Sequence, residues 1–137
     1  MRPSTGLWEV NGVPDSDISQ LDRHKYISLE TFKKNGEGVK TPVWFVVHNG
    51  ALYAYTEADS WKVKRIRNNP RVRVALCDVR GRVKGPWLDG TASIVDGDER
   101  LAADKLLDRK YFFKRIFNFL TRINRHARTM IRIQLAR

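Results

Sequence analysis

The order of strand-like and helical segments between Lys25 and Val95 constrains the fold more than any other feature of this sequence. Three strand-like runs lead into a short basic helix, and two more strand-like runs follow it. Asn-Gly pairs at 35–36 and 49–50 mark the turns that separate the first three runs, as in β-hairpins. This order predicts a small sheet with a helix that begins beside it.

Six short strands are expected along the chain. Alternation of apolar and polar residues indicates half-buried strands, whereas the nearly continuous apolar run Thr41–Val47 indicates one strand buried on both faces. Pro42 lacks an N–H, which indicates a position near a strand start or at an irregularity of the sheet, and Gly90 marks a bulge or bend. Six short strands with Asn-Gly turns predict a small antiparallel barrel. The other expected strands are Ile27–Phe32, Leu52–Thr56, Val72–Leu76, Trp87–Val95 and Thr129–Leu135.

Three helices are expected to interrupt the strands. The first, Ser60–Asn69, is capped by Ser60 or the preceding aspartate and is followed by Pro70. The second runs from about Asp98 to Leu107. The third runs from about Lys110 to Asn124, with phenylalanines on one face and Lys and Arg over much of the rest.

The length of 137 residues predicts one domain, with an N-terminal arm at 1–21 and a barrel domain at 22–137. One cysteine, Cys77, excludes an internal disulfide and fits a cytoplasmic location. No apolar run approaches membrane-spanning length, and the N-terminus lacks the apolar core of a secretory signal. The three histidines have no ligand spacing, so no metal site is expected.

The positive charge lies entirely in the second part of the chain. Residues 1–59 hold 6 Lys and Arg against 8 Asp and Glu, a balance of −2; residues 60–137 hold 20 against 7, a balance of +13. A basic half attracts polyanions: nucleic acid, an anionic membrane or a phosphorylated ligand. A solvated basic surface without any ligand has the same composition.

The segment Thr56–Arg65 carries the best candidate site. Thr56 ends a strand and Ser60 opens a helix, so the Ser60 hydroxyl, free backbone N–H groups and the Lys62 ammonium can converge on one phosphate. Arg65, one turn on, adds a second cation. An ordinary N-capped basic helix would have the same pattern. No motif singles out a catalytic residue, so the chemistry of an enzyme here would come from a bound cofactor.

A family resemblance rests on the run TPVWFVVHNGALYAYTEADSWKVKRIRNNPRVRVALCD, residues 41–78. It resembles the flavin and deazaflavin oxidoreductases of the pyridoxamine 5′-phosphate oxidase-like superfamily, and within it the subgroup described as dependent on coenzyme F420. The likeness covers residues 22–137. It implies a mainly β fold with flanking helices, a six-stranded antiparallel split β-barrel of the FMN-binding type. It also implies a homodimer with the cofactor in a groove between subunits.

The resemblance assigns roles to individual residues. It implies that Ser60, Lys62 and Arg65 hold the cofactor phosphate and that Thr56 closes the same pocket. Trp61 departs from the family pattern, in which a small residue is expected, so its indole either narrows the approach of the phosphate or points to solvent. The residues that match the strand beside the cofactor ring are Thr41, Pro42, Val43 and Trp44.

Coenzyme F420 is the expected cofactor, with FMN as the alternative. Both present a phosphate, but only F420 carries an anionic oligoglutamate tail, which suits the basic half. The implied reaction is hydride transfer to or from a small conjugated substrate.

Two other functions stay open: an FMN-binding protein of the same fold, and a basic β-barrel that binds nucleic acid through aromatics and cations. The aromatics Trp44, Tyr53 and Tyr55 lie in runs typical of a core. For this reason we expect no nucleic-acid partner, and the third helix is more typical of packing than of membrane insertion.

Overall fold

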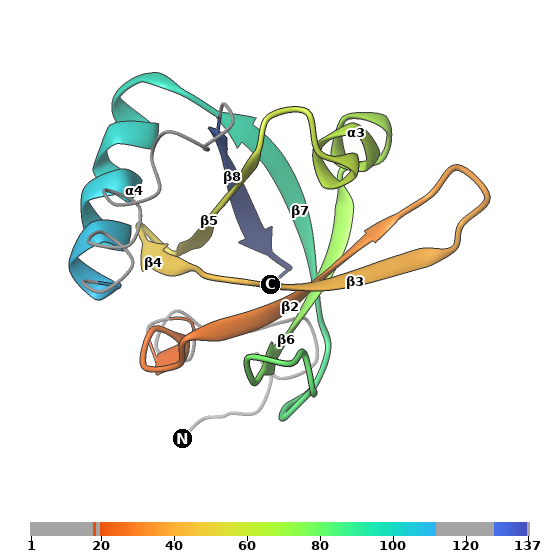
Figure 1. Ribbon diagram of the computed structural model, residues 1–137, viewed down its shortest axis with the longest axis horizontal. Coiled ribbons are helices and arrows are strands. Elements are labelled where there is room, and N and C mark those ends of the chain that lie inside the picture. The colour runs from red at the N-terminus through yellow and green to blue at the C-terminus, as the bar shows by residue number, and fades with distance from the viewer. Residues whose placement is uncertain (1–17, 19, 112–127, 137) are drawn as a thin grey trace.

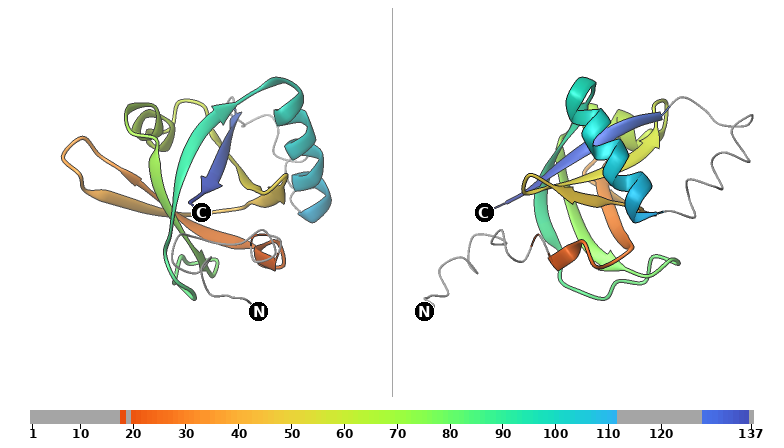
Figure 2. Two further views of the ribbon diagram at one scale, coloured as in Figure 1. Left: turned by 180° about the vertical axis from the view of Figure 1, so that it is seen from behind. Right: turned by 90° about the vertical axis from the view of Figure 1, so that its left-hand side faces the viewer.

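The structure, a computed structural model, describes residues 18, 20–111 and 128–136. In this part of the chain one seven-stranded sheet curls into a barrel, with helices against its outside (Figures 1 and 2). The strands are β2 (Tyr26–Phe32), β3 (Gly38–Val43), β4 (Val46–His48), β5 (Ala51–Glu57), β6 (Arg71–Cys77), β7 (Leu88–Val95) and β8 (Arg128–Leu135). The helices are α3 (Trp61–Asn68) and α4 (Gly97–Lys110).

The sheet has the strand order β3-β2-β6-β7-β8-β5-β4, and all neighbouring strands are antiparallel. The edge strands β3 and β4 are consecutive in the chain, and only Trp44 and Phe45 separate them. The two edges of the sheet therefore meet at this junction, which makes the sheet curl back on itself. The split-barrel fold class is confirmed, although the sheet has seven strands rather than the expected six.

The extra strand arises because the expected single strand Thr41–Val47 is wrong. The chain breaks at Phe45, where the backbone hydrogen bonds go to a side chain instead of a neighbouring strand. The Tyr111 hydroxyl oxygen accepts the Phe45 N–H at 3.1 Å. The same oxygen lies 2.8 Å from the Phe45 carbonyl oxygen and 2.7 Å from the Lys25 carbonyl oxygen, and the hydroxyl donates its one proton to this pair of acceptors. The Trp44 indole stacks on the Tyr111 ring, with centroids 5.0 Å apart and planes 10° from parallel.

Of the bulge or bend expected at Gly90, the bulge is absent from the described sheet. Gly90 pairs in unbroken register with Val72 on one side and Leu135 on the other. A Cβ atom at this position would lie 3.0 Å from the Gln134 carbonyl oxygen. The glycine is explained by the close approach of the next strand's backbone.

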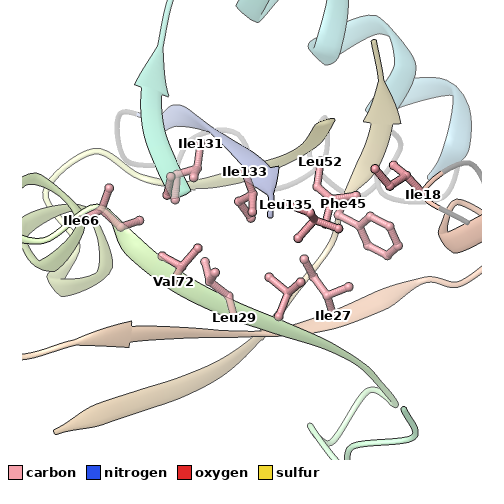
Figure 3. Packing of buried hydrophobic residues seen from close by; sticks show 12 residues of the cluster. Ile18, Ile27, Leu29, Phe45, Leu52, Ile66, Val72, Ile131, Ile133 and Leu135 are labelled. Atoms are coloured by element: carbon pink, nitrogen blue, oxygen red, sulfur yellow. The ribbon is translucent and has the colours of Figure 1, made fainter. Parts of the chain in front are cut away.

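One apolar cluster fills the inside of the barrel (Figure 3). It draws side chains from most strands and from α3, and it includes Ile18, which is fully buried N-terminal of the domain start expected at residue 22. Its members are Ile18, Ile27, Leu29, Phe45, Leu52, Ile66, Val72, Val74, Ala92, Ile131, Ile133 and Leu135.

A second apolar cluster lies under α4, outside the barrel. It joins Ala103 and Leu107 of the helix to Tyr53 and Met130 of the sheet. α4 ends at Lys110, three residues beyond the expected end at Leu107. The rest of the expected third helix lies outside the described residues. None of the helices in the described ranges is long and apolar enough to cross a membrane.

Candidate functional site

The start of α3 lies directly beside the end of β5. Only residues 58–60 separate the two elements, so Thr56 and Ser60 come together, with their hydroxyl oxygens 3.1 Å apart. Ser60 caps the helix, as predicted, because its Oγ accepts the Val63 N–H at 3.3 Å. The cap fixes the first turn of α3 against the barrel.

Two donors at this helix start are left for a ligand. The Ser60 N–H donates to the Glu57 carbonyl, and Val63 donates to the cap. The N–H groups of Trp61 and Lys62 belong to the first turn, which has no preceding helical carbonyl to bond. Neither group meets a hydrogen-bond acceptor in the described part of the chain. Free N–H groups at the positive end of a helix favour an anion.

Two cations add to this positive potential. Burial lowers the pKa of Lys62 from its ordinary value, and the nearby positive charge of Arg65 lowers it further. The Glu57 carboxylate acts in the opposite direction. Lys62 and Arg65 repel each other because both are positively charged. An anion bound beside them would offset this repulsion and stabilise the charged form of both side chains.

Arg65 is anchored away from the helix start. Its Nε donates to the Oγ1 of Thr31, a fully buried residue of β2, at 2.7 Å. The guanidinium thus spans the gap between α3 and β2. Thr56, Ser60, Lys62 and Arg65 therefore form one neighbourhood, in which Arg65 is held by a strand as well as by its helix.

The four residues expected beside the cofactor ring lie at the other edge of the sheet. Thr41, Pro42 and Val43 end β3, and Trp44 follows them at the junction with β4. Pro42 is exposed, whereas Thr41, Val43 and Trp44 are half-buried. The Thr41 Oγ1 is buried and has no hydrogen-bond partner among the described residues. A buried hydroxyl left unpaired in the protein alone fits a strand that flanks a ligand.

Trp61 does not close the helix start. Its side chain is 70% exposed, and the Lys64 ammonium lies 4.4 Å from the centre of its ring. Of the two orientations open from the sequence, the indole takes the one toward solvent.

The groups at the start of α3 fit a phosphate. Its donors are backbone N–H groups, one hydroxyl and two cations, and phosphate needs charge-assisted donors of this kind. The carboxylate of Glu57 is exposed, so water screens its repulsion toward a phosphate. The described residues hold no group of three or more His, Cys, Asp or Glu placed to bind a metal ion.

Sequence reasoning missed two polar clusters that brace the barrel. Tyr111 clamps the β3–β4 junction from 66 residues away, so no local pattern points to it. In the other, Glu99 of α4 accepts the Tyr53 hydroxyl at 2.6 Å and Arg132 at 2.8 Å. Burial and the Glu99 carboxylate raise the pKa of Tyr53 to about 12. This cluster ties α4 to β5 and β8.

Solved structures share this fold at low sequence identity. The conserved hypothetical protein Rv2991 of Mycobacterium tuberculosis is 24% identical, with a TM-score of 0.68, and the match covers 91% of this chain and 82% of that one. An FAD-binding protein of Mesorhizobium loti is 20% identical, with a TM-score of 0.63 and coverages of 90% and 88%. The heme storage protein HutZ of Vibrio cholerae is 16% identical, with a TM-score of 0.60 and coverages of 89% and 87%.

The comparison with curated proteins gives no match. The family model described as pyridoxamine 5′-phosphate oxidase matches residues 18–137, which include every strand and helix of the barrel. The match begins at Ile18, the first described residue of the core. The curled seven-stranded sheet and this match lead to one conclusion: the chain belongs to the pyridoxamine 5′-phosphate oxidase family.

Proposed function

We propose that this protein is an oxidoreductase that binds the deazaflavin coenzyme F420, with FMN as the alternative, through a phosphate at the start of α3. The observation that carries the proposal is the donor set there. Free N–H groups of Trp61 and Lys62 lie beside the Ser60 hydroxyl and two cations. Membership of a family with flavin-binding relatives in the same fold supports a cofactor of this type.

The bound cofactor would supply hydride transfer at its ring, and the protein would hold and orient it. Ser60 and Lys62 would bind the phosphate, and Arg65, one turn further along α3, would contribute its positive charge. Thr56 orients the Ser60 hydroxyl through their 3.1 Å contact. β3 would flank the ring, with the residues from Thr41 to Trp44. No side chain is assigned a proton-transfer role.

The charge distribution favours F420 over FMN. Residues 60–137 carry a balance of +13, from 20 basic and 7 acidic residues. The oligoglutamate tail of F420 is anionic and would follow this basic surface. Exposed charge pairs are screened over about 8–10 Å at physiological ionic strength. The contribution of the tail should therefore be sensitive to salt.

We expect F420 to bind more tightly than FMN at low salt, with a difference in affinity that narrows as salt rises. Fluorescence titrations of both cofactors at low and high salt measure this. If FMN binds more tightly than F420 at both salt concentrations, FMN rather than F420 is the cofactor of this protein. Binding of neither, together with a heme absorbance band in the purified protein, would contradict the proposal altogether.

We propose further that the functional unit is a homodimer with the cofactor groove between its subunits. The family resemblance supports this assembly, because it implies a dimer with the cofactor in a groove between subunits. Light scattering at micromolar concentration should give twice the 15.9 kDa mass of the chain. A monomer that still binds cofactor would contradict the dimer.

The proposal includes neither a nucleic-acid partner nor membrane insertion. Trp44 is half-buried and has one face stacked on Tyr111, and Tyr53 is 3% exposed, so both rings take part in packing. A cytoplasmic location is part of the proposal, on the strength of the single cysteine.

A further inference from the structure

A hollow of about 510 Å³ lies between α3 and the end of β2. Figure 1 shows the two elements on the same side of the barrel, with the β2–β3 hairpin extending past the helix. The helix contributes residues at i, i+3, i+4 and i+7, which form one face. The volume lies within the range of small-molecule sites, about 300–1,000 Å³. The lining residues are Phe32, Lys33, Lys34, Trp61, Lys64, Arg65 and Asn68.

The hollow has an aromatic wall open to solvent. Trp61 lines it and is 70% exposed, the largest exposed fraction among the large apolar side chains described. Phe32 contributes a second ring from β2. An exposed indole presents a wide apolar face on which a planar ring can stack.

The hollow also carries positive charge that the described residues leave unpaired. Four of its lining residues are basic and none is acidic. Lys33 pairs with Glu37 at 2.9 Å. Within the described ranges no carboxylate forms an ion pair with Lys34, Lys64 or Arg65. An anionic group in the hollow would therefore meet uncompensated cations.

Two of these cations are already held in place. The Lys64 ammonium rests over the Trp61 ring, 4.4 Å from its centroid. The Nε of Arg65 is tied to Thr31 at 2.7 Å, which leaves the terminal nitrogens of the guanidinium for a ligand. Groups held in this way lose little conformational entropy when they bind.

We propose that this hollow binds an aromatic ring that carries an anionic group. The ring stacks on the part of the Trp61 indole that the Lys64 ammonium leaves open, and the carboxylate or phosphate lies against Lys64 and Arg65. A neutral aromatic molecule leaves the cations unpaired, and a bare anion leaves the indole exposed. The hollow shares Trp61 and Arg65 with the phosphate site at the start of α3, whereas Phe32, Lys64 and Asn68 extend it along the helix toward the end of β2.

Calorimetric titration with 2-naphthoate tests the site. Trp61→Ala should weaken binding at least about fivefold through lost stacking. Lys64→Gln should weaken it about two- to fivefold through lost charge at an exposed position. Leu101→Ala and Lys105→Gln remove an exposed apolar and a basic side chain from α4, and both should bind as the wild type does. Unchanged melting temperatures in all four variants would show that they are folded.

Two further ligands and one competitor complete the test. The neutral isostere 2-naphthylmethanol and inorganic phosphate should each bind more weakly than 2-naphthoate. A titration with 2-naphthoate in the presence of saturating FMN identifies the natural source of the ring. If 2-naphthoate still binds, the natural ligand is a small molecule separate from the cofactor. If FMN displaces 2-naphthoate, the ring that occupies the hollow is that of the cofactor. Equal binding of naphthoate and naphthylmethanol, or wild-type affinity in Trp61→Ala, would overturn the proposal.

Discussion

Replacing Tyr111 by phenylalanine is expected to lower the free energy of unfolding by about 1–3 kcal/mol, the cost of leaving buried polar groups unsatisfied. The hydroxyl contacts the Phe45 N–H, the Phe45 carbonyl and the Lys25 carbonyl within 3.1 Å. The phenylalanine ring keeps the stack on Trp44, so the variant isolates the hydroxyl. Chemical denaturation followed by circular dichroism measures the change.

A matched control is available on β2. Tyr26 is half-buried, and its hydroxyl makes no hydrogen bond to the described residues, so Tyr26→Phe should change the free energy of unfolding by less than about 0.5 kcal/mol. Equal stability of Tyr111→Phe and Tyr26→Phe would show that the clamp at the β3–β4 junction does not stabilise the fold. A loss confined to Tyr111→Phe would assign the stability to the hydroxyl.

The same junction shows where prediction from sequence stops. The run Thr41–Val47 has the composition of one buried strand, and nothing local distinguishes that strand from two short ones. The break depends on Tyr111, which reaches Phe45 only after the chain has passed through the barrel and along α4. Long-range contacts of this kind leave no periodic signal in the sequence.

Local signals, by contrast, predicted the helix start well. Ser60 caps α3 as predicted, and β5 ends at Glu57, one residue after the expected Thr56, because capping and strand alternation are short-range effects. Gly90 shows the limit of a local rule. A glycine within a strand is typical of a bulge and also of a close backbone neighbour, and only the position of Gln134 in β8 decides between them.

The candidate site divides in the same way. The proximity of Thr56, Ser60 and Lys62 follows from a short connection and helical geometry, which the sequence contains. The hydrogen bond from Arg65 to Thr31 joins residues 34 positions apart, so it could be found only in the folded structure. The exposure of Trp61 and the hollow behind it likewise depend on where β2 ends.

Lys62→Ala is expected to weaken cofactor binding by about 1–3 kcal/mol, the scale of a hydrogen bond to a charged group, which is about 5- to 150-fold in dissociation constant. Lys62 has a lowered pKa through burial and the charge of Arg65, and a bound phosphate would raise that pKa. Cofactor affinity in the wild type should therefore fall as pH rises through the lowered pKa, below the ordinary lysine value of about 10.4. Titration calorimetry with FMN and with F420 across this pH range measures both effects.

Arg67→Ala is the matched control, since it removes one positive charge from an exposed position of the same helix. Its affinity for the cofactor should stay close to that of the wild type, with the same decline at alkaline pH. Lys62→Ala should lose the decline, because the group that titrates is gone. An equal loss of cofactor affinity in Lys62→Ala and Arg67→Ala would show that Lys62 acts only through the overall positive charge of α3. Wild-type affinity and an unchanged alkaline decline in Lys62→Ala would remove this residue from the phosphate site.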